Sequence, residues 1–270
     1  MGVDEHTIEV AGEPVFYRRA PTDGATALLL HSVPTSADDW NELLPLTGGV
    51  AVDLPGFGRS GKGGQIDYSM DAYVEFLERF LRGLSLDRVV VVGHGWGAAF
   101  GLQLAMRYPQ RVAGLALMNP VPLLEGFRWP RAVGWWRRPV IGELLMGSVN
   151  RRVLARTLRG ASASAAAWPD ARVQPVWEQF DQGTQRAILR LHRSVQPGDL
   201  ERAGLGLAAI EQPTLIVWGD EDPWLQRTFA DAYARRIPNA ALEHVSGAGH
   251  WPWLDHPELL QRLAAFVDRP

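Results

Sequence analysis

RVVVVGHGWGAAFGLQLAMRY, residues 88–108, is the stretch that decides the fold. It contains four consecutive valines at 89–92, and such a run is typical of a strand buried on both faces of a sheet. Glycine then occupies positions 93, 95 and 97, and residues 98–108 are expected to be helical. A buried strand that passes through a tight glycine turn into a helix indicates an α/β domain.

The same alternation of strands and helices extends along the chain on both sides. Residues 7–10 and 15–18 are expected to form an opening hairpin. Further strands are expected at 25–30, 50–54, 112–117, 214–218 and 241–244, and helices at 69–84 and 257–267. Residues 121–208 contain helical stretches but no convincing strand. We therefore expect an α/β core over residues 1–120 and 209–270, with a mostly parallel central sheet flanked by helices, and a helical cap, or lid, over residues 121–208.

Composition excludes several classes of protein. The chain of 270 residues has 27 basic and 30 acidic side chains, a formal net charge of -3 and no cysteine. Interspersed charge of this kind offers no face for nucleic acid or an anionic membrane, and the lack of cysteine removes thiolate chemistry. No apolar run approaches the roughly 18–20 residues of a membrane span. We expect a cytoplasmic monomer or homodimer that needs no metal and no cofactor.

Three segments carry the residues suited to chemistry. The turn Gly93-His94-Gly95-Trp96-Gly97 has the strand, turn and helix context of a nucleophile elbow, in which the middle residue normally attacks the substrate. Asp222 ends the segment GDED after the predicted strand 214–218, beside two rival carboxylates, Asp220 and Glu221. His250 ends the segment GAGH after the predicted strand 241–244.

These segments, in this order, resemble the α/β-hydrolase superfamily over essentially the whole chain. The nearest likeness is to the branch that holds haloalkane dehalogenases and epoxide hydrolases. It is carried by HSVPTSADDW (31–40), DLPGFGRS (53–60), GHGWG (93–97), VWGDED (217–222) and GAGHWPWLDHPE (247–258). The resemblance implies that His250 is a general base oriented by Asp222, and that the backbone N–H groups of Trp96 and Val33 form an oxyanion hole.

The departures from that pattern bear directly on function. Gly95 stands where the family has an aspartate or a serine, so this position can supply neither a carboxylate nor a hydroxyl. Ser32 replaces the glycine that usually follows the histidine at position 31. Val33 stands where dehalogenases often have an asparagine that binds halide together with a tryptophan, here Trp96. The tyrosines all lie outside the predicted lid, whereas epoxide hydrolases use two lid tyrosines.

Three hypotheses for function follow. The first is a hydrolase-type protein for a small apolar ester, halide or epoxide whose covalent chemistry has been lost at Gly95, by nature or by engineering. The second is a non-covalent lyase, cyclase or hydratase that uses His250 and Asp222 as a base. The third is a ligand-binding protein without chemistry. In each case we expect an apolar pocket, for which the candidate lining residues are His31, Ser32, Trp129, Trp135 and Trp177.

Overall fold

The computed structural model describes residues 2–269, within which eight strands form one sheet. Their order across the sheet is β1-β2-β4-β3-β5-β6-β7-β8. The β1–β2 and β2–β4 pairs are antiparallel, and every other neighbouring pair is parallel. The mostly parallel sheet predicted from the sequence is confirmed. The strands are β1 (Asp4–Val10), β2 (Glu13–Ala20), β3 (Ala27–Leu30), β4 (Gly49–Val52), β5 (Val89–His94), β6 (Val112–Met118), β7 (Thr214–Gly219) and β8 (Ala240–Val245).

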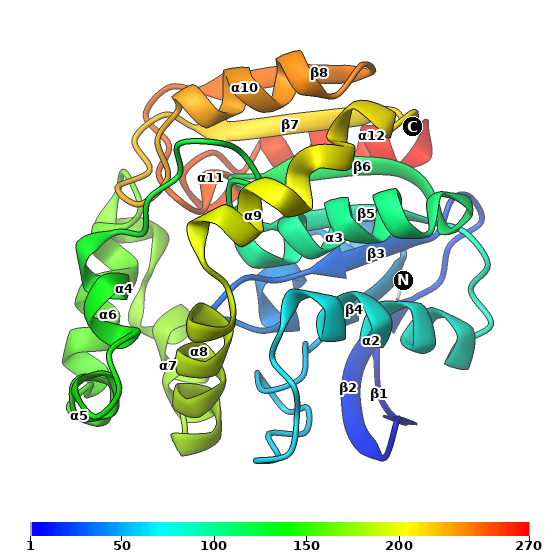
Figure 1. The fold of residues 1–270 in the computed structure, drawn as a ribbon. Helices are drawn as coiled ribbons and strands as arrows, with labels where there is room; N and C mark the ends of the chain where they lie inside the picture. The colour runs from blue at the N-terminus through cyan, green and yellow to red at the C-terminus, as the bar shows by residue number, and fades with distance from the viewer. Residues whose placement is uncertain (1, 270) are drawn as a thin grey trace.

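Helices cover both faces of this sheet (Figure 1). On one face lie α2 (Met70–Gly83) and α3 (Gly95–Arg107), and on the other α12 (Leu259–Asp268), which contacts α1 (Leu44–Thr47). The helix α10 (Thr228–Arg236) packs against β7 and β8, and the short α11 (Pro252–Asp255) precedes α12. The sheet is therefore buried between two helical layers, as the continuous apolar runs of its central strands require.

The turn between β5 and α3 depends on glycine at two positions where backbones approach closely. A Cβ atom added to Gly93 would lie 2.6 Å from the Cα of Ala98, and one added to Gly97 would lie 2.4 Å from the carbonyl oxygen of Leu30. Because α3 already begins at Gly95, it starts three residues before the predicted boundary at position 98. The turn is so tight that its own residues form the first helical turn.

The chain between β6 and β7 is helical, with no strand among the described residues (Figure 1). Five of its helices stand together at the end of the sheet where the site loops lie: α4 (Arg131–Trp136), α5 (Ile141–Gly147), α6 (Arg151–Gly160), α7 (Asp170–Gln179) and α8 (Gln182–Ser194). The helix α9 (Pro197–Ala203) returns over α3, where Gln103 Nε2 donates a 2.7 Å hydrogen bond to the Ala203 carbonyl. The boundaries 121–208 for the lid stay a prediction. None of the described helices is both long and apolar enough to cross a membrane.

Candidate active site

A buried histidine and a buried aspartate meet at the carboxyl edge of the sheet. Asp222 follows β7, His250 follows β8, and the Nδ1 atom of His250 lies 2.6 Å from the Oδ2 atom of Asp222. The two side chains are 6% and 0% exposed, respectively. Because a carboxylate can only accept, Nδ1 is the donor in this bond, which leaves Nε2 as the ring atom that can act as a base. His250 also lines a cavity. The rival Asp220 instead bonds His244 Nδ1 at 2.6 Å.

The carboxylate of Asp222 is held from both sides. Its Oδ1 atom accepts hydrogen bonds from the backbone amides of Trp224 and Leu225, and its Oδ2 atom accepts one from Asn119 Nδ2 at 2.7 Å. Asn119 also accepts a 2.9 Å bond from the Gly219 amide. Asn119 was not predicted as a site residue. Its position directly after the buried strand β6 was a usable signal, because the carboxyl ends of parallel strands share one edge.

The backbone of His250 is anchored to two separate parts of the fold. Its amide donates to the carbonyl oxygen of Ala161, in the segment that follows α6, at 2.7 Å. Its carbonyl accepts a 2.8 Å hydrogen bond from His94 Nε2. Burial lowers the pKa of His94 well below its ordinary value, so this neutral imidazole serves as a support at the turn.

Gly95 has a backbone φ of 51°, in the left-handed region that favours glycine. A Cβ atom on Gly95 would lie 2.3 Å from Ser32 Oγ, 2.8 Å from Ser32 Cβ and 3.7 Å from His250 Nε2. The side chain of Ser32 therefore occupies space that any larger residue at position 95 would need. Positions 32 and 95 are thus close in space although they are far apart in the sequence.

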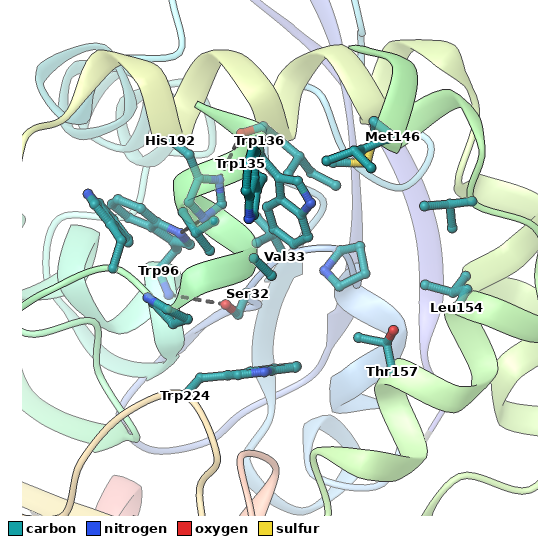
Figure 2. Close-up of a pocket in the computed structure, with 18 of the residues that line it drawn as sticks. Ser32, Val33, Trp96, Trp135, Trp136, Met146, Leu154, Thr157, His192 and Trp224 are labelled. Carbon is teal, nitrogen blue, oxygen red and sulfur yellow. Dashed lines mark hydrogen bonds between the residues drawn. The ribbon is translucent and has the colours of Figure 1, made fainter. Parts of the chain in front are cut away.

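The amide of Trp96, expected to serve an oxyanion hole, has a partner already. It donates to Ser32 Oγ at 3.2 Å, as the dashed line in Figure 2 shows. The oxyanion-hole role of the Trp96 amide stays a prediction, and in this structure the amide is directed at the side-chain oxygen of Ser32. Val33, the other expected contributor, lines the cavity beside Ser32.

The cavity has a volume of about 530 Å³ and a mostly apolar wall built from loops that follow the strands and from helices between β6 and β7. Of the five predicted lining residues, Ser32, Trp129 and Trp135 lie on this wall, and His31 and Trp177 do not. His31 is fully buried because its imidazole bonds the Ser32 carbonyl at 2.6 Å and the Leu54 amide at 2.9 Å. Trp177 instead stacks on Phe180.

The indole of Trp96 points at His192, a histidine of α8 (Figure 2). Its Nε1–H donates to His192 Nε2 at 3.4 Å, and His192 Nδ1 in turn bonds the Ile188 carbonyl at 2.8 Å. Burial lowers the pKa of His192 to about 4, which keeps the ring neutral and able to accept this bond. The indole N–H that a dehalogenase would offer to halide is therefore directed at His192. Among residues 2–269 no group of three or more His, Cys, Asp or Glu side chains could hold a metal ion.

The chain is similar in sequence and in fold to proteins of one known family. A model of the alpha/beta hydrolase family matches residues 27–262. A haloalkane dehalogenase of Mesorhizobium japonicum is 30% identical over 96% of this chain and 89% of its own length. Epoxide hydrolase 2 of Caenorhabditis elegans is 25% identical over 91% of this chain and 74% of its own. The crystal structure of Cfl2 from Burkholderia cenocepacia superposes with a TM-score of 0.87 at 23% identity, covering 98% of this chain and 96% of that one, which is a likeness of fold.

Proposed function

Because the chain belongs to the alpha/beta hydrolase family, we propose that it acts on a small apolar substrate by acid–base chemistry, without a covalent intermediate at residue 95. One observation carries the proposal: an intact, buried His250–Asp222 pair faces the cavity across a residue, Gly95, that has no side chain. A base thus lies beside the position where the nucleophile of the family would stand, and that position has no side chain.

In this mechanism His250 Nε2 removes a proton from the substrate or from a water molecule. Asp222 fixes the tautomer and orientation of the ring and stabilises the imidazolium that forms. Asn119 and the two backbone amides on Asp222 keep the carboxylate from rotating away from His250. The apolar wall of the cavity favours a neutral substrate and excludes bulk water from the proton transfer.

A second candidate is a hydrolase-type protein whose covalent reaction has been lost. It is supported by Gly95 itself, since removing a nucleophile from such a unit costs several orders of magnitude in rate. Two features disfavour dehalogenation as the parent reaction: the Trp96 indole N–H is directed at His192, and Val33 stands at the place of the asparagine. A pure binding protein is the third alternative.

Turnover of one panel of apolar esters, haloalkanes, epoxides and ketones separates these candidates. We expect the unmodified chain to convert at least one compound, and His250→Ala to abolish that activity because the base is removed. If only Gly95→Ser combined with Ser32→Gly is active, the protein is a hydrolase without its nucleophile. Serine at position 95 has to be tested with Ser32→Gly, because its Cβ would otherwise lie 2.3 Å from Ser32 Oγ. Tight ligand binding that His250→Ala leaves intact, without turnover, would indicate a binding protein.

A further inference from the structure

The hydroxyl of Ser32 is a buried polar group placed between the elbow turn and the base. Ser32 is 2% exposed and lines the same cavity as His250. Its Oγ atom accepts the Trp96 amide, and its O–H donates to no protein group among residues 2–269. A hydroxyl that has accepted one hydrogen bond and still has its proton to donate is a donor toward whatever fills the cavity.

We propose that the Ser32 O–H donates a hydrogen bond to a carbonyl oxygen of the substrate, and that the substrate is a small apolar carbonyl compound from which His250 removes the α-proton. The inference rests on the proposed function, in which His250 is the base. It adds a second catalytic residue and the chemical class of the substrate.

Position supports this pairing of roles. The point where a Gly95 Cβ would lie is 2.3 Å from Ser32 Oγ and 3.7 Å from His250 Nε2. The Ser32 oxygen and the His250 nitrogen therefore lie no farther apart than the sum of these two distances. Since residue 95 is glycine, it places no side chain of its own between them. A carbonyl oxygen and its neighbouring carbon can therefore reach the hydroxyl and the imidazole at the same time.

The surroundings of Ser32 strengthen it as a donor. The Trp96 amide belongs to the first turn of α3, a helix of 13 residues whose N-terminus carries partial positive charge. Its N–H polarises the hydroxyl that it binds, and chains of hydrogen bonds reinforce one another in this way. The amide thus acts on the substrate oxygen through Ser32.

The same contact argues against Ser32 as a substitute nucleophile. An attacking hydroxyl needs a hydrogen bond to the base, but no Ser32–His250 hydrogen bond is present among the described residues. Attack would also require the Trp96 amide to stabilise the oxyanion while it remained bound to the attacking atom.

The step balances without a further reactant. The C–H bond next to the carbonyl breaks, its proton passes to His250 Nε2, and its electron pair forms the C=C bond of an enolate. The negative charge that develops on the oxygen is stabilised by the Ser32 O–H. Return of the proton, or of a deuteron from D₂O after exchange on His250, regenerates the ketone.

The test is deuterium uptake by a panel of small apolar ketones in D₂O, followed by proton NMR. We expect the unmodified chain to catalyse exchange and His250→Ala to catalyse none. Ser32→Ala should lower kcat by about 10²–10³-fold, as removal of one oxyanion donor does elsewhere, with little change in KM. Thr214→Val is the matched control, because this buried hydroxyl lies outside the cavity and donates to the Gln212 carbonyl. It should leave both kcat and KM within about threefold of the parent values.

Three results would overturn the inference. Exchange that depends on His250 but is equal in Ser32→Ala removes the donor role and leaves the proposed function standing. Covalent labelling of Ser32 in the unmodified chain by a fluorophosphonate probe, located by peptide mass spectrometry, makes Ser32 a nucleophile instead. Absence of exchange with every ketone removes the carbonyl class, and the proposed function is then decided separately by the His250→Ala comparison on the wider panel.

Discussion

Replacing Gly95 with alanine should destabilise the protein through a clash that can be relieved from a distant position. The added Cβ would lie 2.3 Å from Ser32 Oγ and 2.8 Å from Ser32 Cβ, at a φ of 51°. Overpacking of a buried site costs about 1–3 kcal/mol, and a non-glycine residue in the left-handed region costs about 1–3 kcal/mol. We therefore expect Gly95→Ala to lower the free energy of unfolding by roughly 2–6 kcal/mol.

Urea unfolding followed by tryptophan fluorescence measures this loss, and a double-mutant cycle divides it. In a Ser32→Gly background the overlap disappears, so the cost of Gly95→Ala should fall by about 1–3 kcal/mol. Gly12→Ala is the matched control, because Gly12 has a φ of 84° and no atom within 4 Å of its added Cβ. It reports the cost of the backbone conformation alone. A coupling energy between positions 95 and 32 below about 0.5 kcal/mol would refute the steric argument.

Three further predictions concern buried polar groups. Burial raises the pKa of Asp39 to about 7. Between about pH 4 and pH 7 the folded chain therefore keeps a proton on Asp39 that the unfolded chain has released. The free energy of unfolding should fall by on the order of 4 kcal/mol as the pH rises through this range. Urea titrations should show the difference between Asp39→Asn and the parent following this window. Burial lowers the pKa of His192 to about 4, so the pH dependence has the opposite sign. The free energy of unfolding should fall by on the order of 3 kcal/mol as the pH falls from about 6.5 to about 4. His192→Gln, measured against the parent, should remove this dependence on pH. Asn119→Ala leaves the Gly219 amide without its acceptor and takes a donor from Asp222, so it should cost about 1–3 kcal/mol in thermal or urea unfolding and lower kcat; unchanged stability and kcat would contradict the role assigned to Asn119.

The fold could be predicted well because its determinants are local. The valine run of β5, the glycine turn and the apolar periodicity of α2 each identify an element without reference to the rest of the chain. Boundaries were less accurate where tertiary contacts decide them. The helix α3 begins at Gly95 because Gly93 and Gly97 let the turn pack directly on neighbouring backbone, and that contact has no signature in the residues 98–108 alone.

The candidate site could be predicted only in part. The His250–Asp222 pair was implied by the resemblance to the α/β-hydrolases, whereas position after the strand alone left Asp220 and Glu221 as rivals. The Ser32 contacts with Gly95 and Trp96 could not be found in this way, because they join a loop after β3 to a turn after β5 through side-chain positions. Pairing of the Trp96 indole with His192 likewise depends on how α8 packs against the first turn of α3.

The bond between the His250 amide and the Ala161 carbonyl has a consequence for domain exchange. Ala161 belongs to the inserted segment, so that segment contributes backbone to the mounting of the imidazole as well as wall to the cavity. A chimera that received a foreign cap would lose the base's alignment unless the donor chain supplied a carbonyl oxygen at the same point. Exchange of this segment should therefore change the range of substrates and the alignment of His250 at the same time. Activity should be preserved only when the new segment supplies a carbonyl oxygen that accepts the His250 amide.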